Sequence, residues 1–328
     1  MHPVIDVHTH MMSSEYIKAL KEHGGPRYSV KEVKGGQQAI HLEGAPFTTL
    51  YDEMFDYELR VKNMNKAGVD MSIVSLTCPS VFWGGRDVSV STARLINEEM
   101  HRAQQRHPNR IRWFATLPWQ HADDAIAALE GAVKNGAVGV MVLANIAGED
   151  LTAPQFAKVW EAIDQRGLPV LLHPTAPQGL ASMNLVNFAL VASTGFMLDT
   201  TLALSRMIFD GFFDRYQKLK IIGGHGGAAL PYFIGRLDRC FETIPACREK
   251  ISRRPSTYMR QIYIDSVVYQ QESLELGIQA CGEDNVLYGS DYPHNIGDMA
   301  GCLSRVDSLR NNQRDKVRGR NAMRIFNL

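Results

Sequence analysis

Two histidines end a short apolar run near the start of the chain. The run Val4–His10 ends in His8-Thr9-His10. If this run is a β-strand, side chains two positions apart point to the same side, so His8 and His10 can hold one metal ion together. Histidines at this spacing also occur for packing reasons, so the pair alone leaves both interpretations open.

Three more residues that can bind a metal end apolar runs farther along the chain. They are His173 before a proline, His225 within a glycine-rich segment, and Asp291 after Gly289-Ser290. Each has an ordinary alternative: a core histidine, a glycine-rich turn, or the cap of a following helix. Five such side chains at the ends of four apolar runs are poorly explained by coincidence.

The residue types in this set indicate a particular class of cation. Three imidazoles and a carboxylate suit Zn²⁺, with Mn²⁺, Fe²⁺ or Co²⁺ as alternatives. Such a site leaves an open position for water or substrate. The set therefore predicts a catalytic metal centre.

Eight short apolar runs alternate with amphipathic stretches, which is typical of repeated β-α units around a parallel sheet. In the stretch Pro154–Arg166, apolar residues recur at helical spacing on one face. Glycines that favour helix-to-strand turns precede four of the runs: Gly68, Gly136, Gly167 and Gly282. The eight predicted strands are Val4–His10, Val69–Leu76, Ile111–Pro118, Val138–Ala144, Pro169–Pro174, Lys220–His225, Gln261–Ser266 and Asn285–Asp291.

Eight such units predict a (β/α)8 TIM barrel, which places the carboxyl ends of all strands around one mouth. A doubly wound open sheet would more often have five to seven strands, and no glycine-rich nucleotide-binding motif follows any run. We expect a single domain over residues 1–328. Residues 11–50 and 175–196 follow strands one and five, so they are predicted lid-like insertions over the mouth; residues 244–260 form a third long connection.

Composition points to small-molecule chemistry. The 328 residues contain 35 Lys+Arg and 35 Asp+Glu, so no net charge favours nucleic acid or an anionic membrane. The five cysteines show no CxxC spacing and are read as reduced thiols. We found no secretion signal and no uncharged apolar run of spanning length, and we expect a cytoplasmic protein.

The motifs together resemble the amidohydrolase superfamily, in the branch that contains α-amino-β-carboxymuconate-ε-semialdehyde decarboxylase. The resemblance spans essentially the whole chain. This branch also holds hydroxybenzoate decarboxylases, hydratases and some hydrolases. The segments that carry the resemblance are Ile5–His10, Leu172–Pro174, Gly224–Gly227, Gly235–Asp238, Gly289–Pro293 and Asn321–Phe326.

The resemblance implies a role for each residue of the predicted metal centre. It implies that His8, His10, His173 and Asp291 bind the metal, and that His225 acts as the acid/base beside it. Binuclear amidohydrolases carry a bridging lysine after the fourth strand, and Gly139–Ala144 contains none. A single metal ion is therefore expected.

Two positions bear on how the substrate is held. Arg236 matches an arginine that, in the decarboxylase, reaches a substrate carboxylate in a neighbouring subunit, which implies a homodimer or higher homo-oligomer. The alternative for Arg236 is a helix-surface salt bridge to Asp238 or another acid. At Thr48 the decarboxylase has a second carboxylate-binding arginine, and this departure puts the semialdehyde substrate in doubt.

Aromatic residues near the predicted pocket could stack on a flat conjugated ring, although most are expected to be core. They are Phe47, Phe82, Trp83, Trp113, Phe114 and Trp119. Of these, Phe47 and Trp83, together with Thr48, are the expected substrate contacts. The expected substrate is an aromatic or conjugated carboxylic acid, hydroxybenzoate-like or muconate-like.

The expected reaction is a metal-dependent non-oxidative decarboxylation, with His225 and Asp291 as catalytic residues. Two routes remain open: metal-activated water adds to a conjugated C=C bond before CO₂ leaves, or substrate oxygens bind the metal while Asp291 or His225 protonates the carbon. The alternatives are a hydratase or hydrolase of the same superfamily and a noncatalytic barrel scaffold.

Overall fold

The computed structural model describes residues 2–180 and 182–328. Met1 of the predicted 1–328 domain and Ala181 of the predicted 175–196 insertion lie outside the described residues.

Eight parallel strands form the central sheet, in the order in which they occur along the chain. Each lies inside one of the eight apolar runs of the sequence, so the prediction of these strands is confirmed. The strands are β1 Ile5–His10, β5 Met71–Ser75, β6 Ile111–Thr116, β7 Gly139–Leu143, β10 Pro169–His173, β11 Lys220–Gly223, β12 Ile262–Asp265 and β13 Val286–Leu287.

Backbone hydrogen bonds join the first strand to the segment that begins with the last. Val7 N–H donates to the Tyr288 carbonyl at 2.9 Å, and His10 N–H donates to the Tyr292 carbonyl at 2.8 Å. The sheet is thereby closed on itself, as the predicted (β/α)8 barrel requires.

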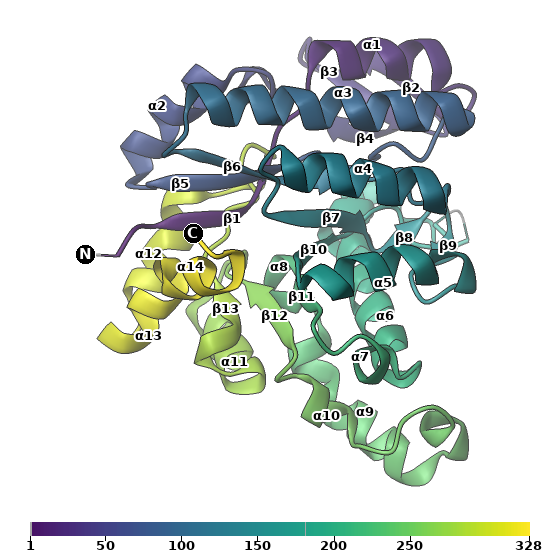
Figure 1. The fold of residues 1–328 in the computed structure, drawn as a ribbon, viewed down its shortest axis with the longest axis vertical. Helices are drawn as coiled ribbons and strands as arrows, with labels where there is room; N and C mark the ends of the chain where they lie inside the picture. Colours follow the sequence, from purple (N-terminus) through teal and green to yellow (C-terminus); the bar gives the residue numbers. More distant parts are fainter. Residues whose placement is uncertain (1, 181) are drawn as a thin grey trace.

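Helices surround the strands (Figure 1). The four predicted glycine turns are confirmed, since Gly68, Gly136, Gly167 and Gly282 all have positive φ. The predicted helix 154–166 consists of a 3₁₀ turn, Pro154–Phe156, followed by α5. The longer helices are α1 Ser14–His23, α2 Tyr57–Ala67, α3 Gly85–Arg106, α4 Ala122–Lys134, α5 Ala157–Arg166, α6 Phe196–Phe209, α9 Leu230–Thr243, α11 Gln271–Cys281, α12 Met299–Asp307 and α14 Asn321–Phe326, and the shorter ones are α7 Phe212–Arg215, α8 Gly224–Gly227, α10 Pro255–Tyr258 and α13 Asn311–Asp315.

The amino-terminal end of the barrel is filled by apolar side chains. Ile5, Phe114 and Leu171 belong to a buried cluster that also includes Ile325 and Phe326 of α14. The rings of Phe114 and Phe326 pack edge to face, with centroids 5.6 Å apart. Because apolar side chains fill this end, a polar site can form only at the opposite end of the barrel.

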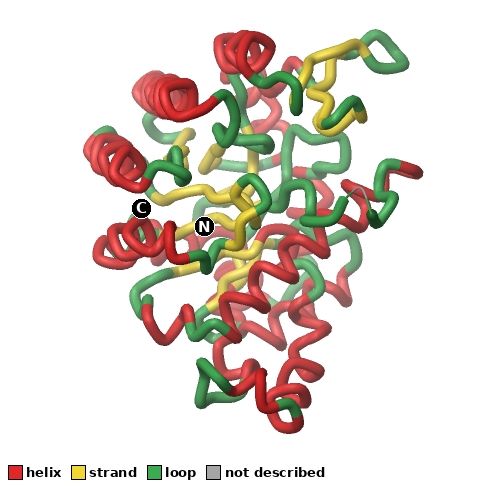
Figure 2. Tube along the Cα trace, turned by 90° about the vertical axis from the view of Figure 1, so that its right-hand side faces the viewer, coloured by secondary structure: helices red, strands yellow, loops and turns green. Residues whose placement is uncertain are grey.

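Residues 11–50 contain more regular structure than the sequence patterns predicted. Besides α1, they form an antiparallel sheet of β2 Tyr28–Glu32, β3 Gln38–Leu42 and β4 Ala45–Thr49. Figure 2 shows these strands as a separate group at the upper edge of the molecule, away from the barrel strands. A two-stranded pair, β8 Asn145–Ile146 and β9 Glu149–Asp150, follows β7.

One helical stretch of the described residues, Asn187–Phe209, is long and apolar enough to span a membrane by length and composition. It runs from the 175–196 segment into α6 and carries the buried carboxylate of Asp199. Its residues Val191 and Phe196 line the cavity described below, which accounts for part of its apolar character.

Candidate metal centre and active site

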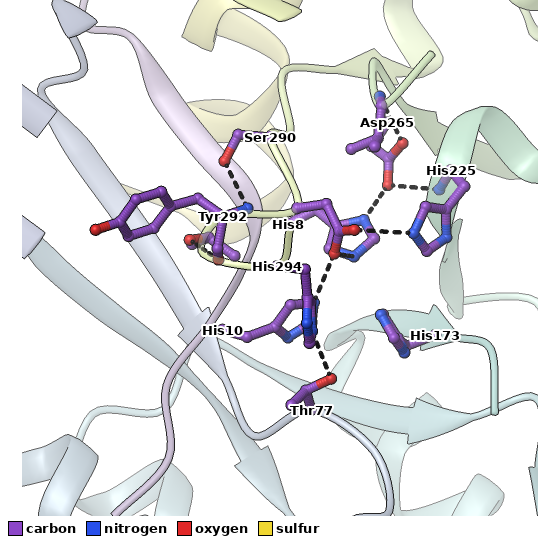
Figure 3. Close-up of polar contacts among 12 residues, drawn as sticks. His8, His10, Thr77, His173, His225, Asp265, Ser290, Tyr292 and His294 are labelled. Atoms are coloured by element: carbon purple, nitrogen blue, oxygen red, sulfur yellow. Dashed lines mark hydrogen bonds and ion pairs between the residues drawn. The ribbon is translucent and has the colours of Figure 1, made fainter. Parts of the chain in front are cut away.

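The barrel brings four of the predicted site residues to one point at its carboxyl end. His8 and His10 come from β1, His173 ends β10, and Asp291 lies four residues after β13. One ligand atom from each lies within 4.8 Å of the others, and all four side chains are buried. Figure 3 shows the rings of His8, His10 and His173 close together. Segments from both ends of the sequence and from its middle therefore share one site.

An irregularity in β1 sets the direction in which the side chains of His8 and His10 point. The register between β1 and β5 shifts between Asp6 and Thr9, which is a β-bulge. Strict alternation would put His8 on the side opposite the interior residues Ile5 and Val7. The bulge turns the end of the strand, so that His8 and His10 both face the mouth.

The inner atoms of this cluster have no hydrogen-bond partners among the described residues. They are the Nε2 atoms of His8, His10 and His173, and Oδ1 of Asp291. Asp291 Oδ1 lies 3.2 Å from His10 Nε2 and 3.4 Å from His8 Nε2, which is ion-pair distance for a protonated imidazole. Burying polar atoms without hydrogen bonds is costly, and four of them converge here. Three imidazole nitrogens and one carboxylate oxygen are a donor set that fits a divalent transition-metal cation.

The outer nitrogen of each histidine is held by a partner, which leaves the inner nitrogen free. His8 Nδ1 lies 2.5 Å from Asp265 Oδ2, His10 Nδ1 lies 3.0 Å from Ser75 Oγ, and His173 Nδ1 lies 2.8 Å from the Pro174 carbonyl. A carboxylate and a carbonyl can only accept, so Nδ1 of His8 and of His173 carries the proton. Such partners fix the ring orientation and the tautomer of metal-binding histidines.

Burial and neighbouring charges set the protonation of these groups. Burial lowers the pKa of His10 to about 3 and holds the pKa of His173 well below its usual range. Burial opposes the charge on His8, but Asp265 and Asp291 raise the His8 pKa to about 10. A cation at His8 Nε2 must therefore displace a proton, because the same lone pair holds either.

Asp291 is ionised despite its burial. Burial raises the pKa of Asp291, but His294 and the other surrounding histidines hold it well below the usual range. The residue has φ 57°, and its N–H donates to the His8 carbonyl at 2.8 Å. The sequence predicted that Asp291 ends strand eight; in the structure β13 ends at Leu287 and Asp291 lies in the following turn, tied to β1.

Asp265, at the end of β12, supports the site and was missed by the sequence reasoning. Besides binding His8, it accepts the N–H of His225 at 3.0 Å and of Gly226 at 2.8 Å. Its pKa is lowered below the usual value, because the attraction of His8 outweighs the burial that raises it. The rule that polar residues at strand ends face the mouth applies equally to Ile264-Asp265 and could have found it.

His225 lies in a tight turn, not at the end of a strand as predicted. β11 ends at Gly223, and His225 has φ 54° within α8. A Cβ on Gly224 would lie 3.1 Å from His8 Cε1, and one on Gly226 would lie 2.5 Å from Val268 Cγ1. The glycines thus allow the turn to approach the cluster, where His225 Nε2 lies 3.5 Å from Asp291 Oδ2.

A cavity of about 420 Å³ opens above the cluster. His173, His225, Asp291 and His294 lie at its polar end. Side chains from residues 11–50 and from residues 175–196 form much of its wall, including Leu42, Phe47, Thr48, Leu180, Val191 and Phe196. The cavity is within the size range of sites that enclose small organic ligands.

His294 is a second residue that the sequence reasoning missed. Its Nε2 lies 3.0 Å from Thr77 Oγ1, and its ring centroid is 5.1 Å from that of His10. Burial lowers its pKa, so the ring is neutral near pH 7. The sequence signal was its position three residues after Asp291, at the end of the same segment.

The predicted substrate contacts have separate locations. Phe47 and Thr48 line the cavity. Trp83 is not among the described residues that line it; its indole N–H donates to the Ser80 carbonyl at 2.8 Å, and its ring packs against Tyr16. The other predicted aromatics, Phe82, Trp113, Phe114 and Trp119, likewise lie outside the described lining.

Arg236 lies on α9, exposed and outside the described cavity lining of its own chain. The suggested ion pair with Asp238 is not among the contacts of the described residues, and Asp238 accepts the Ser256 N–H at 2.8 Å instead. Within one chain, Arg236 is therefore not part of the described cavity wall.

The chain is similar to known enzymes over nearly its full length. The family model described as amidohydrolase matches residues 5–328. A 2-amino-3-carboxymuconate-6-semialdehyde decarboxylase from Dictyostelium discoideum is 25% identical over 331 residues, covering 99% of this chain and 91% of the relative. A γ-resorcylate decarboxylase from Polaromonas sp. is 29% identical over 284 residues, covering 82% and 86% of the two chains.

Solved structures share the fold. The 5-carboxyvanillate decarboxylase of Sphingomonas paucimobilis has a TM-score of 0.87 at 24% identity, with 100% of both chains covered. The dihydroxybenzoic acid decarboxylase of Polaromonas sp., with bound manganese and the inhibitor 2-nitroresorcinol, has a TM-score of 0.81 at 24% identity, covering 100% of this chain and 98% of that one. With the family model matching from the first barrel strand to the last helix, this chain belongs to the amidohydrolase family.

Proposed function

We propose that this chain is a metal-dependent carboxy-lyase, which removes CO₂ without oxidation from an aromatic or conjugated acid of the hydroxybenzoate or muconate type. The observation that carries the proposal is the set of four buried ligand atoms without hydrogen-bond partners that converge at the end of a cavity. The decarboxylase names of the relatives support the reaction class.

His8, His10, His173 and Asp291 are the proposed ligands of a single cation. Their donor set suits Zn²⁺, our first assignment, with Mn²⁺, Fe²⁺ or Co²⁺ as alternatives. Manganese in a structural neighbour favours testing Mn²⁺ early. When bound, the cation supplies a Lewis acid that polarises a substrate oxygen.

His225 and Asp291 are the proposed proton-transfer residues. When the bond to the carboxylate carbon breaks, its electron pair stays on the substrate carbon and CO₂ leaves. A proton must then reach that carbon. Because Asp291 is ionised, it can deliver a proton only after it has taken one up, and His225 Nε2, 3.5 Å from Asp291 Oδ2 at the cavity end where the substrate would lie, is placed to exchange one with it. Proton exchange with solvent restores the donor.

The reaction is tested by measuring CO₂ release from 2-hydroxybenzoate, 2,6-dihydroxybenzoate and muconate derivatives. We expect release from at least one acid by the metal-loaded protein and none after metal removal. Hydration or ester cleavage without CO₂ would instead assign a hydratase or hydrolase. A stable, metal-free and inactive protein would assign a scaffold.

Two substitutions separate the roles of the histidines. His173→Ala removes a proposed ligand, so metal content and rate should fall together. His225→Ala lies outside the four-residue cluster, so metal content should stay near that of the parent protein while kcat falls by about 10²–10⁴-fold. Equal metal loss in both variants would make His225 a ligand.

We also propose that the enzyme acts in the cytoplasm as a homodimer or higher homo-oligomer. Five free cysteines, three of them buried, support a reducing compartment. The exposure of Arg236, together with its place on a helix that carries the exposed aromatic Tyr232, supports a role in a neighbouring copy's site.

A further inference from the structure

The cavity has two chemically different ends. His173, His225, Asp291 and His294 gather at the proposed metal. Away from them, the walls are dominated by apolar side chains contributed by two segments far apart in the sequence. They include Leu42 and Phe47 from the 11–50 segment and Leu180, Val191 and Phe196 from the 175–196 segment and the start of α6.

The two segments meet directly beside the cavity. The rings of Phe47 on β4 and Phe196 on α6 pack edge to face, with centroids 6.0 Å apart. Phe47 and Phe196 are each only partly buried, so both retain surface on the cavity side. An apolar group placed between these walls would be removed from water on several sides.

The described lining contains no lysine or arginine. Its carboxylates are Asp291 at the metal end and Glu43, which is exposed and pairs with Arg27 at 3.7 Å. A second substrate carboxylate along the apolar walls would therefore lose water without gaining a cationic partner from this chain. If Arg236 of the partner subunit reaches the site, as proposed above, its one cation serves the carboxylate that reacts, and Thr48 offers only a hydroxyl where the related decarboxylase has a second arginine.

The size of the cavity leaves room beyond a single ring. At about 420 Å³ it lies in the range of about 300–1,000 Å³ that encloses drug-sized ligands. A ring carrying only a carboxylate and hydroxyl groups would leave part of the apolar wall uncovered. An apolar substituent on that ring would fill the remaining volume.

From these features we propose that the substrate is an aromatic monocarboxylic acid bearing an apolar substituent, such as an alkyl chain, seated against Phe47, Val191 and Phe196. The inference rests on the proposed decarboxylase function and names the substrate class of that site. Each methylene that becomes buried is expected to raise kcat/KM about fourfold until the cavity is full.

The test compares CO₂ release from four acids: 2-hydroxybenzoate, its 6-methyl and 6-pentyl derivatives, and the 6-carboxy derivative. We expect kcat/KM for the pentyl acid to exceed that of the parent acid by at least about tenfold. The dicarboxylic acid should react more slowly than the parent. Equal rates for alkyl and parent acids, or preference for the dicarboxylic acid, would overturn the inference while leaving the decarboxylase function intact.

A binding measurement makes the inference independent of turnover. Calorimetry with the metal-loaded protein should find that 3-pentylphenol binds at least about tenfold more tightly than phenol. If both phenols bind equally, the apolar site is refuted even if CO₂ is released. If no acid releases CO₂ but pentylphenol binds preferentially, the proposed reaction fails and the apolar site stands.

Two variants locate the apolar site. Val191→Asp places a charge on the wall, so it should remove most of the advantage of the pentyl acid and of pentylphenol. Leu198→Asp is a matched control on α6, because Leu198 is 40% exposed and is not among the described lining residues. The control should keep the advantage, and loss of it in both variants, or in neither, would contradict the assignment; thermal unfolding of each variant establishes that it is folded.

Discussion

Asp265 connects the proposed metal ligand His8 to the turn that carries His225. Its one carboxylate receives His8 Nδ1 and the backbone N–H groups of His225 and Gly226. It therefore fixes the tautomer of a proposed metal ligand and the turn that carries the proposed acid/base. Asp265 therefore couples metal binding by His8 to the position of the proposed acid/base His225.

Asp265→Asn should weaken metal binding about 10–100-fold. An asparagine can keep only one oxygen, and placing that oxygen toward Gly226 directs the amide NH₂ at His8 Nδ1. His8 would then accept at Nδ1 and carry its proton on Nε2, where the cation must bind. The metal dissociation constant, measured by competition with a chelator, checks this.

A matched control for that substitution is Asp56→Asn at the start of α2. Asp56 accepts the N–H of Glu58 and Leu59, and asparagine caps helices as well as aspartate does. This variant should keep the parent metal affinity. Unchanged affinity in Asp265→Asn would show that Asp265 does not set the His8 tautomer.

The ligand-type residues could be predicted because their signal is local. His8 and His10 share one strand, and His173 directly ends an apolar run. Asp265 also ends an apolar run, but its role in the site depends on a contact with His8, 257 positions away, which no local pattern reveals. The bulge that turns His8 inward is likewise set by pairing between β1 and β5, which the sequence of one strand does not reveal.

Among the elements, the barrel strands were predictable, whereas the strands of residues 11–50, exposed like β2 or largely buried like β3, were not. The barrel strands are continuous apolar runs because both of their faces are covered. β2 has the sequence Tyr-Ser-Val-Lys-Glu and is only partly buried or exposed, so neither period nor composition identifies it. The sequence predicted that His225 and Asp291 end strands, but both lie in turns. The positive φ of these two residues arises from contacts in the folded chain, so the sequence did not reveal it.

Asp199 on α6 anchors the segment that leaves the metal site. Its carboxylate accepts the Thr175 N–H at 2.9 Å and the Asn145 side-chain amide at 2.9 Å. Burial raises the pKa of Asp199 to about 6. The Asp199 carboxyl group therefore changes charge at mildly acidic pH. The backbone N–H that it accepts belongs to Thr175, two residues after His173.

The Asp199 pKa predicts a specific pH dependence of stability. The folded protein holds this proton more tightly than the unfolded chain, so the contribution is full below about pH 4 and is lost as pH rises through about 6. The loss amounts to at most about 3 kcal/mol of unfolding free energy. The free energy of unfolding, measured with a denaturant between pH 4 and pH 7, should fall less steeply with rising pH in Asp199→Asn than in the parent protein.

The control for this slope is Asp123→Asn, whose parent side chain is 92% exposed. It should reproduce the parent dependence across the same range. A parent slope that survives unchanged in Asp199→Asn would contradict the assignment to this carboxyl group.

At the scale of the whole molecule, Arg236 is exposed on α9 and lies outside the described cavity lining of its own chain. Helix α9 extends from the lower part of the barrel in Figure 1 and exposes Tyr232 and Phe233, at 79% and 40%. Exposed aromatic residues beside an arginine are typical of protein interfaces. A second copy of the chain would cover this surface and bring Arg236 to a site other than its own.

Mixing two inactive variants tests this arrangement. Arg236→Ala keeps the proposed ligands, and His173→Ala keeps Arg236, so each mixed dimer contains one complete site. Random pairing of equal amounts should restore about a quarter of the parent activity, because half of the dimers are mixed and each has one working site. Arg239→Ala on the same helix, where Arg239 pairs with Glu242 at 3.3 Å, should stay active alone. Mixed dimers that form, as judged by mass, yet release no CO₂ would contradict a role for Arg236 in the partner's site, and Arg236 would then act only on its own chain, outside the described cavity lining.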